Sequence, residues 1–253
     1  MTLLAPDEPG PVRVTRASGA SDFVLTADHA GKLIPRRLAE LGVSAAELER
    51  HIACDIGIAA VTERLSVALD ATAVLQTYSR LVIDCNRDPS WPSAIPAISE
   101  HTEIPGNVNL SDEDRAARVS EIFQPFHNRI EQLLDARAAA GQRGVLVAMH
   151  SFTPTFKGES RAMEVGVLYF RKTKLAEIML DLLRAEGDLT VGENAPYALT
   201  EDSDYSIPYH AERRGLEHVE IEIRQDLITS PEGQAAWADR FARLLTMALP
   251  RLA

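Results

Sequence analysis

The sequence predicts a single-domain α/β protein, a three-layer αβα sandwich built around a mostly parallel mixed sheet. Short apolar runs of strand length alternate with helical stretches of ten or more residues, which is typical of a parallel sheet covered by helices on both faces. The chain has 253 residues, of which 45% are hydrophobic. That length supports one sizeable core, and α/β folds of this size are commonly one domain.

Composition restricts the partners and the compartment. The formal net charge of −11 argues against nucleic acid or an anionic membrane as a partner, because both need a basic face. No stretch approaches the roughly 20 apolar residues that span a bilayer. Two cysteines, Cys54 and Cys85, and a start without a secretory signal favour a reducing compartment, so we expect a cytoplasmic protein. A small-molecule carboxylate remains as the expected partner, and the oligomeric state is open.

Turn residues and helix caps give the expected element order. Residues 1–20 are rich in Pro, Gly and Ser and predict an irregular lead-in, with the domain proper over 21–253. The first half predicts a strand over Asp22–Asp28, a helix from the Ser44 cap to about Leu69, and strands over Ala71–Tyr78 and Leu81–Cys85. A proline-rich loop over 88–110 follows, and we expect it to border the functional site.

The second half is predicted by the same signals. It comprises a helical region from the Ser111 cap to about Ala140, strands over Gly144–Met149, Met163–Phe170 and Val219–Ile223, a helix over Lys174–Glu186, and a last helix from the Ser230 cap to about Leu249.

Two histidines end short apolar runs far apart in the sequence. His29 lies in Thr-Ala-Asp-His-Ala-Gly and His150 in Val-Ala-Met-His-Ser, and an open α/β sheet delivers such residues to its carboxyl edge. Neutral imidazole suits Zn²⁺, which usually takes three protein ligands in a catalytic site. The best third ligand is Asp55, an acid inside an expected apolar helix. His51, four residues earlier on the same helical face, is a further ligand candidate or a partner that orients Asp55.

A structural interpretation of these residues is also available. One histidine at a strand end is more often hydrogen-bonded than metal-bound, although two such histidines weaken that interpretation. For Asp55, a structural role in helix capping or a salt bridge is about as favoured as metal ligation.

A second group of polar residues follows in the run Arg80–Arg87. Strand alternation would place Arg80, Asp84 and Asn86 on one face with Arg87 at its exit. Such a group predicts a receptor for a carboxylate, or an arginine that steadies a developing oxyanion. The alternative is that Arg80 and Asp84 simply pair with each other.

A third group lies in the late strand. Glu220, Glu222 and Arg224 alternate with apolar residues, so they share one face. A carboxylate there can act as a proton shuttle, and we select Glu222 for that role. The alternative is a solvent-facing edge strand with an Arg–Glu ladder.

The order of these motifs resembles the N-formylglutamate amidohydrolase family. It consists of His-Ala-Gly near the start, Tyr-Ser-Arg-Leu-Val-Ile-Asp-Cys-Asn-Arg, Met-His-Ser, and Ile-Glu-Ile-Arg-Gln-Asp-Leu, and it covers most of residues 22–245. That family is related to zinc carboxypeptidases and aspartoacylase. The resemblance implies a phosphorylase/hydrolase-like α/β fold, one zinc ion per chain, and hydrolysis of the amide of an N-formyl or N-acyl amino acid.

The resemblance also implies roles for individual residues. His29 and His150 match the metal histidines and Glu222 matches the catalytic glutamate, while Arg80 and the Asn86-Arg87 pair match the substrate-holding positions. The wider carboxypeptidase pattern has a glutamate three residues after the first histidine, where this chain has Lys32. The carboxylate ligand must therefore come from elsewhere, and Asp55 is our inference.

The expected mechanism combines these roles. His29, His150 and Asp55 hold Zn²⁺, whose water attacks the amide carbonyl while Glu222 moves the proton. Arg80 stabilises the oxyanion, and Asn86 and Arg87 bind the substrate carboxylate. The same ligands would also suit iron or cobalt.

The sequence also suggests roles for two further histidines and leaves two alternative functions open. His210 is a further substrate contact or a structural residue, and His127 is mainly a packing residue. The alternatives to the amidohydrolase are a zinc peptidase acting on short peptides and a non-catalytic binder of small carboxylates.

Overall fold

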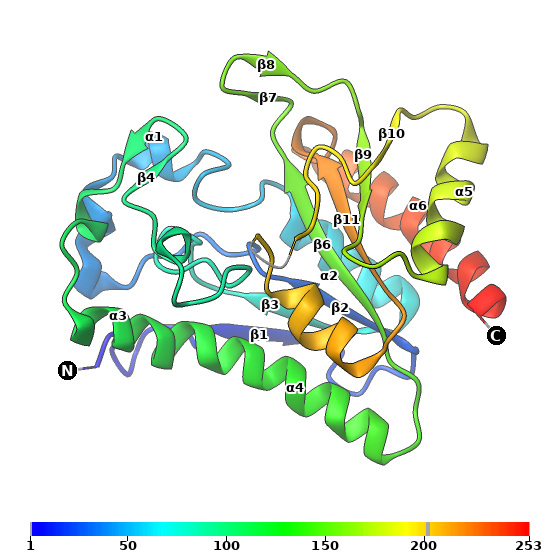
Figure 1. Cartoon of the computed structure of the whole chain (residues 1–253), viewed down its shortest axis with the longest axis horizontal. Coiled ribbons are helices and arrows are strands. Elements are labelled where there is room, and N and C mark those ends of the chain that lie inside the picture. The colour runs from blue at the N-terminus through cyan, green and yellow to red at the C-terminus, as the bar shows by residue number, and fades with distance from the viewer. Residues whose placement is uncertain (1, 201–202, 253) are drawn as a thin grey trace.

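A seven-stranded sheet runs through the centre of the protein (Figure 1). The computed structural model describes residues 2–200 and 203–252. The strands follow the spatial order β1-β3-β2-β6-β11-β9-β10. In chain order they are β1 Val12–Thr15, β2 Phe23–Ala27, β3 Thr72–Gln76, β6 Val145–Phe152, β9 Val165–Leu168, β10 Val191–Glu193 and β11 His218–Arg224.

The sheet is mixed and mostly parallel, as the sequence predicted. Strands β3, β2, β6 and β11 run parallel to one another. At one edge β1 pairs antiparallel with β3, and toward the other edge β9 is antiparallel to β11, with β10 parallel to β9. The four central parallel strands therefore end at one edge of the sheet, where ligands bind in open α/β folds.

Helices cover both faces of this sheet. They are α1 Ala45–Leu48, α2 Ile58–Leu69, α3 Asp112–Arg118, α4 Gln124–Ala139, α5 Lys174–Glu186 and α6 Pro231–Ala248. Helices α2, α5 and α6 share one apolar cluster with the strands, and α4 shares the other (Figure 1). Two small hairpins lie outside the sheet, β4 Ile98–Ser99 with β5 Thr102–Glu103, and β7 Thr155–Phe156 with β8 Glu159–Ser160. Among the described residues no helix is long and apolar enough to cross a membrane.

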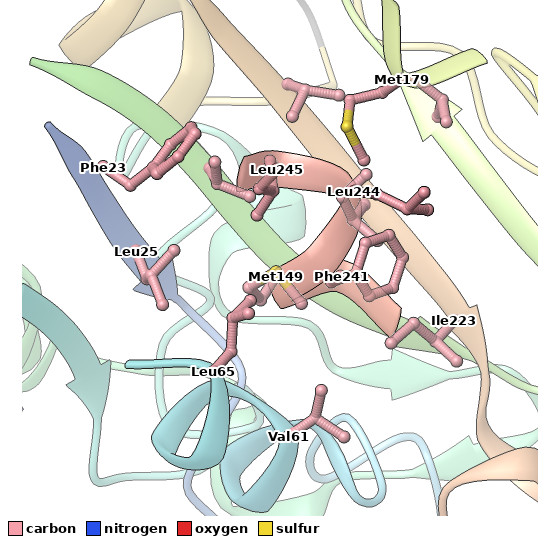
Figure 2. Close-up of a cluster of buried hydrophobic side chains, with 14 of the residues drawn as sticks. Phe23, Leu25, Val61, Leu65, Met149, Met179, Ile223, Phe241, Leu244 and Leu245 are labelled. Carbon is pink, nitrogen blue, oxygen red and sulfur yellow. The ribbon is translucent and has the colours of Figure 1, made fainter. Parts of the chain in front are cut away.

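The larger core cluster lies between the sheet and the α2, α5 and α6 layer. Figure 2 shows Phe241, Leu244 and Leu245 of α6 lying against strand residues that include Leu25 and Met149. Each fully buried side chain of this size contributes about 1.5–3 kcal/mol relative to an exposed one. Strand β6 is buried along its whole length. Side chains alternate along a strand and Met149 faces the α6 side, so the even-numbered residues, His150 among them, point to the face away from α6.

Two expected elements differ from the observed ones around the site. The expected strand over Leu81–Cys85 is wrong, because residues 79–87 form turns without a strand ladder. Their apolar side chains are buried against α4 and the 94–107 region instead of a strand neighbour. The Asp84 amide donates to the carbonyl of Ala94 at 2.7 Å, so loop contacts replace the sheet.

The expected helix from Ser44 to Leu69 is interrupted. Ser44 does cap α1, accepting from the Glu47 amide, but the chain is irregular from residue 49 to 57. Gly57 stands at φ +82 immediately before α2, and a positive φ ends a right-handed helix. His51 and Asp55 therefore do not share a helical face, which corrects the expected relation between them.

The N-terminal segment also contains more structure than expected. Residues Val12–Thr15 of the 1–20 segment form β1, which extends the sheet beside β3. The expectation of an irregular lead-in is wrong for these four residues, because alternate valines in a Pro- and Gly-rich segment are enough to pair with an exposed sheet edge.

Gly57 is predicted to tolerate no side chain. A Cβ at this position would lie 2.2 Å from the carbonyl oxygen of Ile228, whereas a Cβ at Gly141, also at positive φ, meets nothing within 4 Å. Left-handed backbone alone costs an L-residue about 1–2 kcal/mol. We expect Gly57→Ala to lower the free energy of unfolding in urea by clearly more than Gly141→Ala does. Equal losses in the two variants would contradict the close approach.

Candidate metal centre and substrate cleft

A cleft of about 450 Å³ lies at the carboxyl edge of the central strands. Its lining includes residues from the ends of β2, β6 and β11, the irregular 80–87 segment, and the loop over 93–100 that was expected to border the site. This volume is in the range of pockets for small molecules, about 300–1,000 Å³. The topology therefore brings the three groups of polar residues to one place.

His29, Asp55 and His150 meet at this cleft as a buried group. Their potential ligand atoms all lie within 4.8 Å of one another. His29 Nδ1 is 3.5 Å from Asp55 Oδ1, and His150 Nδ1 is 3.1 Å from Asp55 Oδ2. The two imidazole rings are in edge contact, with centroids 5.0 Å apart. Asp55 therefore lies between the two histidines, as its proposed role as third ligand requires.

The outer nitrogen of each histidine faces a second carboxylate. His29 Nε2 is 2.7 Å from Asp84 Oδ1, and His150 Nε2 is 3.3 Å from Asp28 Oδ2. Such partners fix the orientation and tautomer of an imidazole and leave its other nitrogen free to ligate. In His29 the nitrogen without a partner among the described residues is Nδ1, whereas in His150 Nδ1 contacts Asp55 Oδ2 at 3.1 Å and Nε2 has no hydrogen-bond partner there. The Nδ1 atoms of both rings face Asp55.

Backbone contacts place Asp55 in this position. Its amide donates to the carbonyl of His29 at 2.9 Å, and its Oδ2 accepts from the Ser151 amide at 3.1 Å. The short irregular segment before α2 thus spans from the end of β2 to the end of β6. The break in the expected helix is what allows Asp55 to reach both strands.

The charges of this group are set by burial and by each other. Burial and Arg80 oppose protonation of His29, but Asp84 and Asp55 raise its pKa above the usual value. Burial also opposes protonation of His150, yet surrounding carboxylates raise its pKa well above the usual value. Burial alone would raise the pKa of Asp55, but the two histidines hold that pKa far below its usual range. Asp55 is therefore ionised, the form that binds a cation.

The donor set fits a divalent metal. His29 Nδ1 is buried and has no hydrogen-bond partner among the described residues, and a buried polar atom without a partner is costly. Two imidazole nitrogens and one carboxylate match the ligands of catalytic zinc sites. A metal ion would satisfy the free nitrogen and neutralise the buried carboxylate.

Glu222 and Glu220 both reach the site from β11, which is an interior strand and not the solvent-facing edge considered as an alternative. Burial raises the pKa of each carboxyl group to about 8. Glu220 Oε2 lies 3.9 Å from His150 Nε2, the side of the ring away from Asp55. The charges of His150, Asp55 and Arg80 also act on the pKa of Glu222, and both glutamates line the cleft.

Arg80 pairs with Asp84, which was the alternative interpretation. Arg80 Nη2 and Nε donate to Asp84 Oδ2 at 2.5 and 3.1 Å. Arg80 Nη1 also lies 3.6 Å from Asp55 Oδ1, and the side chain lines the cleft. The guanidinium is therefore part of the charge network around His29, and it still borders the space where a substrate would lie.

Asn86 and Arg87 have different contacts. The Asn86 side chain accepts from the amides of Tyr205 and Ser206 at 3.0 and 2.9 Å and donates to Asp204 at 3.0 Å. Asn86 is thus largely engaged in holding the 204–206 segment. Arg87 is partly exposed in the cleft, 3.6 Å from Asp204, and its guanidinium is the more available of the two for a carboxylate.

The remaining histidines lie away from the metal group. His51 lines the cleft, but its Nε2 is 3.6 Å from Glu100 and it is not part of the cluster with His29. His210 is fully buried, absent from the cleft lining, and bonded through Nε2 to His127 Nδ1 at 2.8 Å. The expected substrate contact of His210 is therefore replaced by its structural alternative. His127 in turn donates to the Cys85 carbonyl at 2.9 Å.

Sequence reasoning missed two acids, Asp28 and Asp204, and placed Glu220 on the same face as Glu222 without giving it a role. Asp28 and Glu220 surround His150, and Asp204 holds Asn86 and Arg87. Of the two missed acids, only Asp28 had a local signal, because it directly precedes His29 at the strand end. Asp204 is more than 100 residues from Asn86 and Arg87 in sequence, and nothing in its sequence neighbours pointed to the site.

A mostly parallel sheet that presents two histidines and a buried carboxylate at its carboxyl edge defines an α/β protein with a candidate metal centre. The comparisons identify the family. The family model of N-formylglutamate amidohydrolase matches residues 21–229, so the chain belongs to this family. The family implies a hydrolase that acts on amide bonds.

Solved structures agree with this assignment. A gene product of Agrobacterium tumefaciens is 41% identical, with a TM-score of 0.95 and 99% of each chain covered. An N-formylglutamate amidohydrolase from Ralstonia eutropha JMP134 is 19% identical, with a TM-score of 0.66 and coverage of 95% of this chain and 97% of that one. At 19% identity, the similarity to the Ralstonia eutropha protein shows the fold alone. The comparison with curated proteins finds no match.

The buried His127–His210 pair predicts a pH dependence of stability. Burial lowers the pKa of His127 to about 4 and that of His210, with help from His127, to about 2. Both lie below the unfolded value near 6.5, so their neutral forms stabilise the fold above that pH. This contribution is lost as pH falls from 6.5 toward 4, at about 1.4 kcal/mol per pH unit for each histidine.

The test compares wild type with His210→Gln in urea unfolding from pH 7.5 to 5. The variant is expected to be less stable at pH 7.5, and the difference is expected to shrink below pH 6.5. A difference that stays constant over this range would show that His210 is not buried in the neutral form.

Proposed function

We propose that this protein is a zinc-dependent amidohydrolase that cleaves the amide of an N-formyl or N-acyl amino acid, with N-formylglutamate as the model substrate. The observation that supports this most directly is the buried His29–Asp55–His150 group at a small cleft, with Glu222 beside it. The family membership supports amide hydrolysis. The metal, the acyl group and the amino acid belong to the proposal.

His29 Nδ1, His150 Nδ1 and the Asp55 carboxylate are the atoms that would hold the metal ion. When bound in such a site, zinc polarises a carbonyl group and lowers the pKa of water toward neutrality. Asp84 orients the His29 imidazole through its Nε2, and Asp28 lies 3.3 Å from His150 Nε2. The same donor atoms also suit iron or cobalt.

Glu222 is the proposed general base and acid. Its Oε2 is buried and has no hydrogen-bond partner among the described residues, so it is free to take a proton from the attacking water. A pKa of about 8 lies near neutral pH, where a group both accepts and releases protons efficiently. The carboxyl group then donates that proton to the nitrogen of the leaving amine.

Two arginines would act on the substrate. Arg80 brings a positive charge to the edge of the metal group, where negative charge develops on the amide oxygen during attack. Arg87 would bind the carboxylate of the amino acid, and Asn86 supports it by fixing the 204–206 wall. A cationic position within the cleft explains how a protein of net charge −11 selects an anion.

The size of the cleft favours a small substrate. A volume of about 450 Å³ holds an acylated amino acid, whereas a peptidase acting on longer chains needs a groove that continues past the scissile bond. The rates on N-formyl amino acids and on peptides of increasing length distinguish these substrates.

Metal analysis tests the centre itself. Elemental analysis of the purified protein is expected to give about one zinc ion per chain, and His29→Ala is expected to lose it. Lys32→Ala is a matched control, because Lys32 pairs with Glu49 on the surface and lies outside the group. Wild-type protein that binds no divalent metal after incubation with zinc would overturn the proposal.

The role of Glu222 is tested by a pair of variants on one strand. Glu222→Gln is expected to retain zinc and to lower kcat/KM by about 10²–10⁴-fold, the usual contribution of a general acid–base group. Glu220→Gln, on the same face with a similarly raised pKa, is expected to lose much less. A Glu222→Gln enzyme with near-normal turnover would exclude Glu222 as the proton shuttle.

A further inference from the structure

One wall of the cleft is aromatic. Phe152 at the end of β6, Phe156 in the β7–β8 hairpin and Tyr197 in the segment after β10 all line the cleft. The hairpin extends from the end of β6 (Figure 1). Tyr197 remains 42% exposed although it belongs to a concave site. These three residues, which we call the aromatic wall, therefore offer apolar surface to an occupant of the cleft.

Arg161 connects the three rings without lining the cleft itself. Its guanidinium carbon lies 4.7 Å from the ring centroid of Tyr197, 4.8 Å from that of Phe156 and 5.7 Å from that of Phe152. Its Nη1 donates to the Tyr197 hydroxyl at 2.8 Å. Cation–π contacts of this kind hold aromatic rings in fixed positions. The aromatic wall is therefore preorganised, and a ligand that packs against it loses little free energy to the ordering of side chains.

A second hairpin brings another apolar side chain to the same cleft. Ile98 in β4 lines the cleft and is 61% exposed. The β4–β5 and β7–β8 hairpins meet, because the Lys157 amide donates to Glu100 Oε1 at 3.4 Å. A single exposed isoleucine needs no explanation, but an apolar side chain that shares a concave site with aromatic rings is typical of a ligand contact.

The proposed mechanism leaves this apolar surface unused. Glu222 and the metal group act at the amide, and Arg87 binds the carboxylate of the amino acid. A formyl group carries only a hydrogen atom beyond its carbonyl carbon, so it buries almost no apolar surface. The cleft of about 450 Å³ therefore contains a region for which an N-formyl amino acid has no matching group.

The aromatic wall and Arg87 belong to different sides of the metal group. Phe152 follows His150 by two residues along β6, whereas Arg87 follows Asp84, the partner of His29, by three. In an N-acyl amino acid the amide carbonyl lies between the acyl substituent and the carboxylate of the amino acid. With the carboxylate at Arg87 and the carbonyl at the metal group, the acyl substituent extends to the His150 side, where the aromatic wall lies.

We propose that the aromatic wall and Ile98 form a subsite for an apolar acyl group, so that the enzyme prefers N-acyl amino acids with a hydrocarbon acyl chain. This inference rests on the proposed function and specifies the acyl class within it. Packing of the chain against Phe156 and Tyr197 removes apolar surface of both partners from water. The gain grows with each methylene group until the wall is covered.

The test compares N-acetyl-, N-butanoyl- and N-hexanoyl-L-glutamate, which share one amino acid and differ only in the length of the acyl chain. Wild type is expected to gain about fourfold in kcat/KM for each added methylene that contacts the wall, the factor that corresponds to about 0.8 kcal/mol. Tyr197→Ala and Phe156→Ala are expected to lose most of this gain while hydrolysing the acetyl derivative at a near-normal rate. Tyr197→Phe, which keeps the ring, is expected to retain the gain.

Phe170→Ala is the matched control. The Phe170 ring is also partly buried and lies near an arginine, with the guanidinium carbon of Arg171 5.9 Å from its centroid, but it does not line the cleft. This variant is expected to keep the wild-type dependence on chain length. A wild-type kcat/KM that stays constant or falls along the series would overturn the inference, as would an undiminished gain in both Tyr197→Ala and Phe156→Ala.

A second series identifies the part of the substrate that carries the apolar group. It keeps the acetyl group and lengthens the side chain of the amino acid, from N-acetyl-L-alanine to N-acetyl-L-norleucine. A gain in this series alone would assign the aromatic wall to the side chain of the amino acid and overturn the acyl assignment.

Calorimetry separates failure of this inference from failure of the proposed function. If wild type hydrolyses no member of the acyl series, the proposed function fails, but binding of the uncleaved compounds still tests the aromatic wall. Tighter binding of the hexanoyl than of the acetyl derivative, with the difference lost in Tyr197→Ala, supports the inference. Equal binding of the two derivatives by wild type, or binding of neither, overturns it.

Discussion

The burial of one carboxylate, that of Asp55, constrains the whole site. A carboxylate removed from water is strongly unfavourable unless charged or hydrogen-bonding groups surround it. Here the partners come from two separate segments: His29 after β2, and His150 with the Ser151 amide on β6. Adjacent parallel strands must therefore end in register, and the chain before α2 must leave the helix to reach them. Fold and site are set by the same interaction.

Long, periodic segments could be predicted from the sequence, and the site segments could not. Residues Lys174–Glu186 form a helix with the expected bounds, because propensity, cap and apolar spacing agree. The run Leu81–Cys85 has the composition of a strand, yet buried polar groups outside it hold it as a turn. Arg118 donates to the Val82 carbonyl and His127 to that of Cys85. Such partners lie tens of residues away, so no local pattern reveals them.

The sequence was enough to pick out single residues of the candidate site, but not to predict which of them contact one another. His29 and His150 could be found because each ends an apolar run, and Asp55 because it is an acid in an apolar segment and Lys32 occupies the usual ligand position. The helical relation of His51 to Asp55 was wrong, since a glycine at positive φ interrupts the helix. Which acid faces which histidine depends on strand order, and strand order is a property of the fold.

The location of each part on the fold has an evolutionary consequence. Both histidines and the two glutamates belong to interior strands or their ends, where neighbours on both sides fix them. Phe156, which lines the cleft, belongs to a two-stranded hairpin outside the main sheet. Insertions or substitutions in such a hairpin disturb few core contacts. The hairpin side of the cleft can therefore change while the proposed metal ligands and glutamates stay in place, and it is the natural place to alter ligand selection by design.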